Sequence, residues 1–239
     1  MGNSKRHKTE SSPNIVESTE SGTYSESVSL ESSSDEIVYE VADLSVSNWT
    51  DVSILMDQSR MFPSSEEFLS LFVNSKVLVS GDLILSFCGF LEVPKVLEMI
   101  HKKLREALSS LISTAEKNKI KSSEVYIFYM ERAANLPLEM ILSLYRSLSL
   151  GRFKYMIFVS RVKPCGKREV KNLMEDFKEY NPVDLSHIPV RGEEILLLSS
   201  HIAKKQIGMN NNIFRLFLMD RKMFESFIKL FEKEISKSI

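Results

Sequence analysis

The residues best suited to acid–base or metal chemistry in this sequence are four histidines and two cysteines. The histidines are His7, His101, His187 and His201. A catalytic histidine needs a partner within hydrogen-bond reach, and none of the four has such a partner close to it in the sequence. We therefore interpret all four as structural. Cys88 and Cys165 are far apart and form no CxxC motif, which indicates neither a zinc site nor a disulfide framework.

A second candidate is the polar stretch ERAAN, which follows the apolar run VYIFYM and begins with Glu131 and Arg132. The two residues could be an acid and its charge partner in a reactive loop, or they could lie in a joint between two packed elements. Charged residues at the end of a buried strand more often pair or face water, so we favour the joint. Pro137 would then set the start of the next helix, with Asn135 as its candidate cap, and the charged pair could still face a partner.

Motifs for nucleotide binding and hydrolysis are missing from the sequence. The chain has eight glycines, and they form neither GxGxxG nor GxxxxGK[ST]; GxSxG and HExxH do not occur either. The sequence therefore excludes nucleotide binding by these two routes. We expect a protein that is not an enzyme and that has no catalytic residues, no cofactor and no metal site.

Charge is divided unevenly along the chain. Residues 1–40 carry three Lys/Arg and eight Asp/Glu, a net charge of −5, whereas residues 41–239 carry 28 and 24, a net charge of +4. Residues 1–35 are rich in Ser and Glu and poor in large apolar residues, which predicts a disordered tail before a single domain at 36–239. The tail could act as a mobile counterion for a very basic protein, or it could be a solubilising extension.

Basic residues gather in a segment for which we expect a long loop. They are Arg161, Lys163, Lys167, Arg168 and Lys171. This possible contact loop could bind phosphates or an acidic partner, or it could simply be solvated. It lacks interleaved aromatic residues and the chain as a whole is not basic, so we expect no direct nucleic-acid binding. No apolar run approaches the length of a bilayer span, so we expect no membrane insertion.

The elements that must position these residues follow from apolar periodicity. Apolar runs at 125–130 and 153–160 flank an amphipathic segment at 138–148, a pattern typical of a strand–helix–strand crossover. Further strands are expected at 36–44, on both sides of a turn at 80–82, at 193–205 and at 212–219. Helices are expected after Asn48, from Ser64 to Phe72, from Pro94 to Thr114, at 168–180 and at 221–235. The predicted fold class is α/β (α+β), a central mixed β-sheet with helices packed on it.

The segment VYIFYMERAANLPLEMILSLYRSL resembles the most recognisable segment of the BCCIP/BCP family, in which an apolar strand ends in Glu-Arg and an Asn precedes the proline of a following helix. The matching residues are Glu131, Arg132, Asn135, Pro137, Leu142, Tyr145 and Leu148. Less specific likenesses extend over residues 31–237. The resemblance implies a fold similar to that of the GNAT acetyltransferases, without that activity.

The resemblance also implies a function. It suggests a nuclear protein that could also shuttle to the cytoplasm. This protein would bind other proteins, chaperone a basic ribosomal protein and take part in nuclear export or ribosome biogenesis. Nuclear transport factors are further candidate partners. Glu131, Arg132, Asn135, Pro137 and Tyr145 are then candidate partner-binding residues. The alternative is an acyl-CoA-dependent acetyltransferase, and the sequence lacks the Arg/Gln-x-x-Gly-x-Gly/Ala loop that binds the pyrophosphate in such enzymes.

Overall fold

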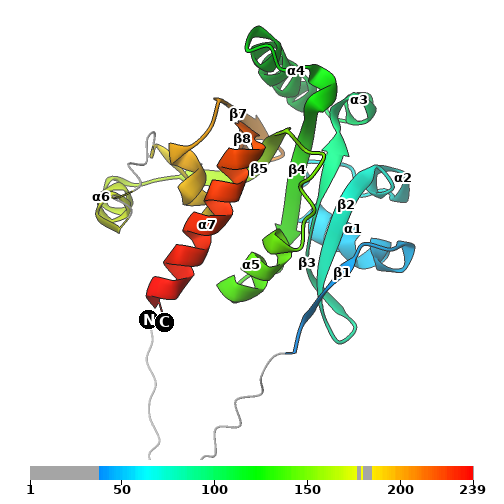
Figure 1. Cartoon of the computed structure of the whole chain (residues 1–239), viewed down its shortest axis with the longest axis horizontal. Coiled ribbons are helices and arrows are strands. Elements are labelled where there is room, and N and C mark those ends of the chain that lie inside the picture. The colour runs from blue at the N-terminus through cyan, green and yellow to red at the C-terminus, as the bar shows by residue number, and fades with distance from the viewer. Residues whose placement is uncertain (1–37, 177–178, 180–184, 239) are drawn as a thin grey trace, which may run out of the picture. The chain divides into compact units, whose positions relative to one another are not determined.

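A mixed β-sheet with helices on both faces forms the centre of the computed structural model, which describes residues 38–176, 179 and 185–238. The fold class expected from the sequence is therefore confirmed (Figure 1). The predicted tail, residues 1–35, lies outside the described residues. Among the described helices, none combines the length and the apolarity that crossing a bilayer requires.

Strands and helices are interspersed along the chain. The strands are β1 (Glu40–Asp43), β2 (Phe72–Ser80), β3 (Leu83–Glu92), β4 (Val125–Arg132), β5 (Tyr155–Pro164), β6 (His187–Pro189), β7 (Ala203–Met209) and β8 (Asn212–Asp220). The α-helices are α1 (Trp49–Asp57), α2 (Glu66–Leu69), α3 (Val93–Val96), α4 (Lys102–Lys117), α5 (Leu138–Arg146), α6 (Lys167–Asp176) and α7 (Arg221–Ser238). The 3-10 segments within the described residues are η1 (Val46–Asn48), η2 (Ser122–Glu124) and η4 (Gly192–Ser199).

The strand order in the sheet is β1-β2-β3-β4-β5-β8-β7, with β6 paired to the far end of β5. The β4–β5 pair is parallel and is connected through α5, as the predicted crossover requires. All other strand pairs are antiparallel. The predicted hairpin at 80–82 is also confirmed, because Gly81 adopts φ +57° between β2 and β3.

Alternate side chains of the strands enter two separate cores, one on each face of the sheet. Helices α1 to α4 cover one face, where Tyr129 of β4 is buried with Phe87 of β3. Helices α5 and α7 and the segment η4 cover the other, where Phe128 of β4 is buried with Phe158 of β5 (Figure 1). Burial on both faces explains why β4 and β5 read as continuous apolar runs rather than as alternating ones.

Three of the expected elements are corrected by the structure. The segment Gly192–Ser199 is a buried 3-10 helix, and β7 begins only at Ala203. The helix expected from Pro94 to Thr114 is divided into α3 and α4, because the His101 side chain caps a new helix start. Helix α2 ends at Leu69, is capped by Ser65 instead of Ser64, and leaves Phe72 to begin β2.

Glycine is required at one interior position of the sheet. Gly89 of β3 faces a bulge in β2, where the pairing register shifts between Val73 and Lys76. A Cβ at position 89 would lie 2.8 Å from the Cβ of Ser75 and 2.9 Å from Cδ1 of Phe72. Asn74 holds the bulge in place, because its Nδ2 donates a hydrogen bond to the carbonyl oxygen of Ser149 at 2.8 Å and its φ is +50°.

We expect Gly89→Ala to lower the free energy of unfolding by about 2 kcal/mol, because the new methyl group overpacks the bulge. Gly208→Ala is the matched control, since a Cβ at this β7 position meets no atom within 4 Å. Urea unfolding followed by circular dichroism measures both. Equal stability of the two variants would contradict the close approach of β2 and β3.

Candidate functional site

Strands β4 and β5 diverge, and the space between them is filled by a later segment of the chain. Within the described residues, the two strands pair only from Val125–Tyr155 to Phe128–Phe158, although β4 continues to Arg132 and β5 to Pro164. The chain after β6 enters this space, beginning with a hydrogen bond of 2.8 Å from the Val190 N–H to the carbonyl oxygen of Arg161.

Arg191 bridges the two diverging strands. Its Nη2 donates to the carbonyl oxygen of Met130 and to Oε2 of Glu131, both at 2.7 Å. Its Nη1 donates at 3.0 Å to Oε1 of Glu194, whose Oε2 accepts a hydrogen bond of 2.5 Å from Ser160 of β5. The Arg191 guanidinium thus stands where inter-strand hydrogen bonds would otherwise join β4 to β5.

The same network continues across the sheet to the loop that follows α1. The Tyr129 hydroxyl donates to Oε1 of Glu131 at 2.8 Å and lies 2.6 Å from Oγ of Ser59. Burial and the nearby Glu131 carboxylate raise the pKa of Tyr129 well above its usual value. This tyrosine therefore remains a neutral hydrogen-bond donor across the physiological pH range.

A second ion pair lies beside the first. Nη2 of Arg132 donates to Oε2 of Glu193 at 3.1 Å, and Nη1 lies 3.0 Å from Oε1 without the alignment of a hydrogen bond. Burial, followed by the charges of Glu193 and Glu194, raises the pKa of Tyr145. The Tyr145 hydroxyl is fully buried and has no hydrogen-bond partner among the described residues. Three buried polar atoms around Glu193 thus retain unused hydrogen-bonding capacity.

The network contains more acids than bases. Its carboxylates belong to Glu131, Glu193 and Glu194, and its guanidiniums to Arg132 and Arg191, so full ionisation would leave a buried formal charge of −1. Burial raises the pKa of Glu194 to about 7, with Glu193 adding to the rise and Arg191 opposing it. In Arg191 burial lowers the pKa, but the charges of Glu131 and Glu194 outweigh burial and raise it overall.

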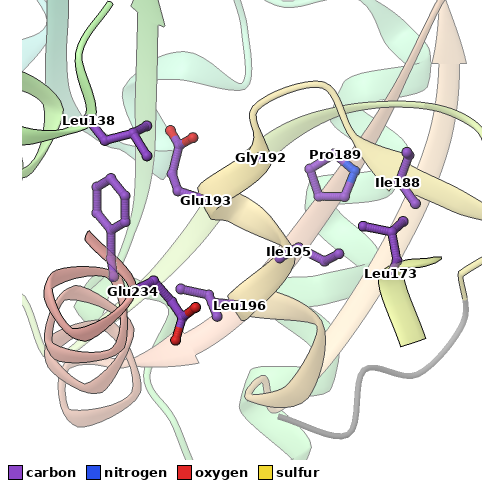
Figure 2. Close-up of a pocket in the computed structure, with 10 residues that line it drawn as sticks. Leu138, Leu173, Ile188, Pro189, Gly192, Glu193, Ile195, Leu196 and Glu234 are labelled. Carbon is purple, nitrogen blue, oxygen red and sulfur yellow. The ribbon is translucent and has the colours of Figure 1, made fainter. Parts of the chain in front are cut away.

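An apolar cavity of about 340 Å³ adjoins this network on the face covered by α5 and α7. Its apolar lining consists of Leu138, Leu173, Ile188, Pro189, Ile195, Leu196 and Phe231. Glu193 and Glu234 are its charged lining residues, and Figure 2 shows the Glu193 carboxylate at the end beside Leu138. The cavity therefore has an apolar body and two separate acids in its lining, a composition typical of binding sites.

The family-motif residues divide into buried and exposed members. Glu131 and Tyr145 are 2% and 0% exposed, and neither presents its side chain at the surface. Asn135 and Pro137 are exposed, and Arg132 is half-buried against Glu193. The interpretation of Asn135 as the helix cap is wrong, because Pro137 is the N-cap of α5 and Asn135 occupies the preceding turn with φ +59°.

The expected basic loop is a strand and a helix. Arg161 and Lys163 belong to β5, whereas Lys167, Arg168 and Lys171 belong to α6. Several of them have acidic or carbonyl partners: Arg161 donates to the carbonyl oxygen of Gln58, Lys163 pairs with Glu169, and Lys171 pairs with Glu175. Their proposed contact with phosphates or an acidic partner stays a prediction.

The histidines and cysteines lie apart from the network. Nδ1 of His101 accepts from the Lys103 N–H at 3.2 Å and so has the structural role expected for it. His187 lies in β6, and burial lowers the pKa of His201 beside Phe217. His7 lies outside the described residues. Within the described part of the chain, no group of three potential ligands could hold a metal ion.

Sequence reasoning missed Arg191, Glu193 and Glu194 as partners of the ERAAN pair. A signal was present, because two acids directly adjoin the apolar run ILLL just as Glu131 and Arg132 adjoin VYIFYM. Charged residues next to runs that must be buried need partners of opposite sign. Their separation of about sixty positions left nothing in the sequence to pair them.

We expect Arg191→Met to lower the free energy of unfolding by about 3–5 kcal/mol, because it leaves the Glu131 and Glu194 carboxylates buried without their cation. Arg168→Met, on the exposed surface of α6, is the matched control and should change stability little. Chemical denaturation measures both. Equal effects would contradict the role of Arg191 in joining the two strands.

We expect Glu194→Gln to flatten the dependence of stability on pH. Because the pKa of Glu194 is raised to about 7, the folded state keeps a proton that the unfolded state releases. This contribution to stability is full below about pH 4.5 and is lost as pH rises through about 7, a total of about 3 kcal/mol. Urea titrations from pH 5 to 8 should show this loss in the wild type and not in the variant. Parallel pH profiles would contradict the raised pKa.

Comparisons with known proteins support the fold. No family model matches the chain, and no curated protein matches it. The crystal structure of BCP1 from Saccharomyces cerevisiae is similar over 90% of this chain and 96% of BCP1, with 15% sequence identity and a TM-score of 0.56. An uncharacterised protein from Bacillus halodurans has 10% sequence identity, over 82% of this chain and 91% of that protein. An N-acetyltransferase from Staphylococcus aureus Mu50 has 6% identity, over 77% of this chain and 98% of that enzyme. Each has a TM-score of 0.38, which is too low to support an argument. The chain has the fold of BCP1, as its resemblance to the BCCIP/BCP family predicted.

Proposed function

We propose that this chain is a non-enzymatic, nuclear protein-binding factor that escorts a basic ribosomal protein and acts in nuclear export or ribosome biogenesis. The observation that carries the proposal is the filled space between β4 and β5. The acids in this space that could act as catalytic groups are Glu131 and Glu194. They are 2% and 0% exposed, and both form ion pairs with Arg191. A catalytic group must reach its substrate, and these groups reach only each other.

The fold shared with BCP1 supports a BCP1-like role in general terms. The finer statements, a basic ribosomal cargo, nuclear location and contact with transport factors, come from the family resemblance. The acidic N-terminal segment suits a basic cargo, because carboxylates attract and mask positive charge.

The acetyltransferase alternative lacks an observation in its favour. Pyrophosphate is commonly held by backbone N–H groups where a glycine-rich turn enters a helix. The turn from β4 into α5, residues 133–137, contains no glycine, and its last residue, Pro137, has no N–H to offer.

The proposal is tested by mixing the full-length chain with acid-extracted total ribosomal proteins at low and moderate salt. We expect the chain to keep one or a few basic ribosomal proteins in solution, and moderate salt to weaken the effect because charges drive the encounter. Mass spectrometry of the soluble fraction identifies the proteins retained.

A variant with Glu17, Glu20, Glu26 and Glu31 replaced by Gln is the matched control for the acidic segment. If that segment masks the cargo, this variant retains less of it. The proposal fails if the folded wild-type chain retains no basic ribosomal protein at either salt concentration. A rise in melting temperature with acetyl-CoA would instead support the enzyme alternative.

A further inference from the structure

The cavity shown in Figure 2 has exposed apolar residues in or next to its lining segments. Leu138 lines the cavity and is itself 41% exposed, and the exposed residues Met174 and Val190 directly follow the lining residues Leu173 and Pro189 in the sequence. These are three of the seven exposed large apolar side chains of the described residues. Exposed apolar side chains around a recess are typical of protein docking surfaces.

Glu193 is the acid at the end of the cavity beside Leu138. The Glu193 carboxylate is at the cavity wall, and its Oε1 accepts no hydrogen bond within the described residues. Nη1 of Arg132, 3.0 Å away, neutralises the carboxylate without saturating it. The carboxylate is fully buried, so it contributes negative charge to the cavity wall rather than a hydrogen bond to an occupant.

The charged lining residues are both acids, Glu193 and Glu234, and no Lys or Arg is among the described lining residues. Glu139, next to the exposed Leu138, adds an acid in the first turn of α5. The Glu234 carboxylate already has Lys237 at 2.7 Å, and Lys171 of α6 is paired with Glu175. A partner segment with Lys or Arg beside its apolar residues is therefore favoured over an acidic one.

The cavity is small relative to ligand pockets in general. Its volume of about 340 Å³ falls near the lower end of the usual range of about 300–1,000 Å³. That space suits one or two large side chains better than an extended cofactor.

We infer that this cavity is an anchor pocket that receives an apolar side chain from a basic protein segment. The inference rests on the proposed function and deepens it, because it assigns the surface on which the basic cargo docks. The anchor side chain fills the apolar body, and a neighbouring Lys or Arg faces the Glu234 end.

The test compares Leu138→Glu with Leu83→Glu as the matched control. Both leucines are exposed, so both variants should fold, and Leu83 lies at the start of β3 away from the cavity lining. We expect Leu138→Glu to bind the retained ribosomal proteins about tenfold more weakly than the wild type, and Leu83→Glu to bind them like the wild type. If both variants bind like the wild type, the inference is overturned while the proposed function stands.

A second measurement does not depend on a ribosomal cargo. Fluorescence polarisation follows two labelled peptides with the same Leu and Phe residues, one flanked by Lys and the other by Glu. The wild type should bind the Lys peptide more tightly, and Leu138→Glu should abolish the difference. Equal binding of both peptides, or binding of dodecanoate alone, overturns the inference even if the ribosomal proteins are retained through another surface.

Discussion

The structure depends on one constraint: two central parallel strands separate halfway along their length, and the groups exposed by the separation must be satisfied without water. Arg191 meets this need, because one guanidinium bonds to the Met130 carbonyl oxygen and to two carboxylates. A buried cation of this kind is stable only when each neighbour is paired, which explains why Glu131 and Glu194 accompany it. The sheet is closed by side chains where backbone pairing ends.

The same closure separates the buried ion pairs from the exposed apolar residues. The charged residues of the network are buried and bonded to one another, whereas apolar residues such as Leu138 are exposed at the surface. Tyr145 connects the two regions, since its ring packs against Phe224, Phe227 and Phe231 of α7, and Phe231 lines the cavity.

Elements whose local pattern agrees with their environment could be predicted from the sequence. β4 and β5 were identified because buried parallel strands read as uninterrupted apolar runs, and the β2–β3 hairpin because Gly81 allows a positive φ. The run ILLL looks the same as a strand, but the charges of Glu193 and Glu194 bind it to distant partners and it folds as a 3-10 helix. The ion-pair network could not be predicted from the sequence for the same reason, because its pairs join segments that share no local pattern.

The position of Arg191 in the chain has a consequence for synthesis on the ribosome. Strands β1 to β5 are complete by Pro164, but the residue that joins β4 to β5 emerges more than twenty positions later. During that interval the nascent chain carries two diverging strand ends with unpaired backbone groups and the uncompensated carboxylate of Glu131. Translation must therefore pass Glu194 before the ion pairs that join β4 to β5 can all form.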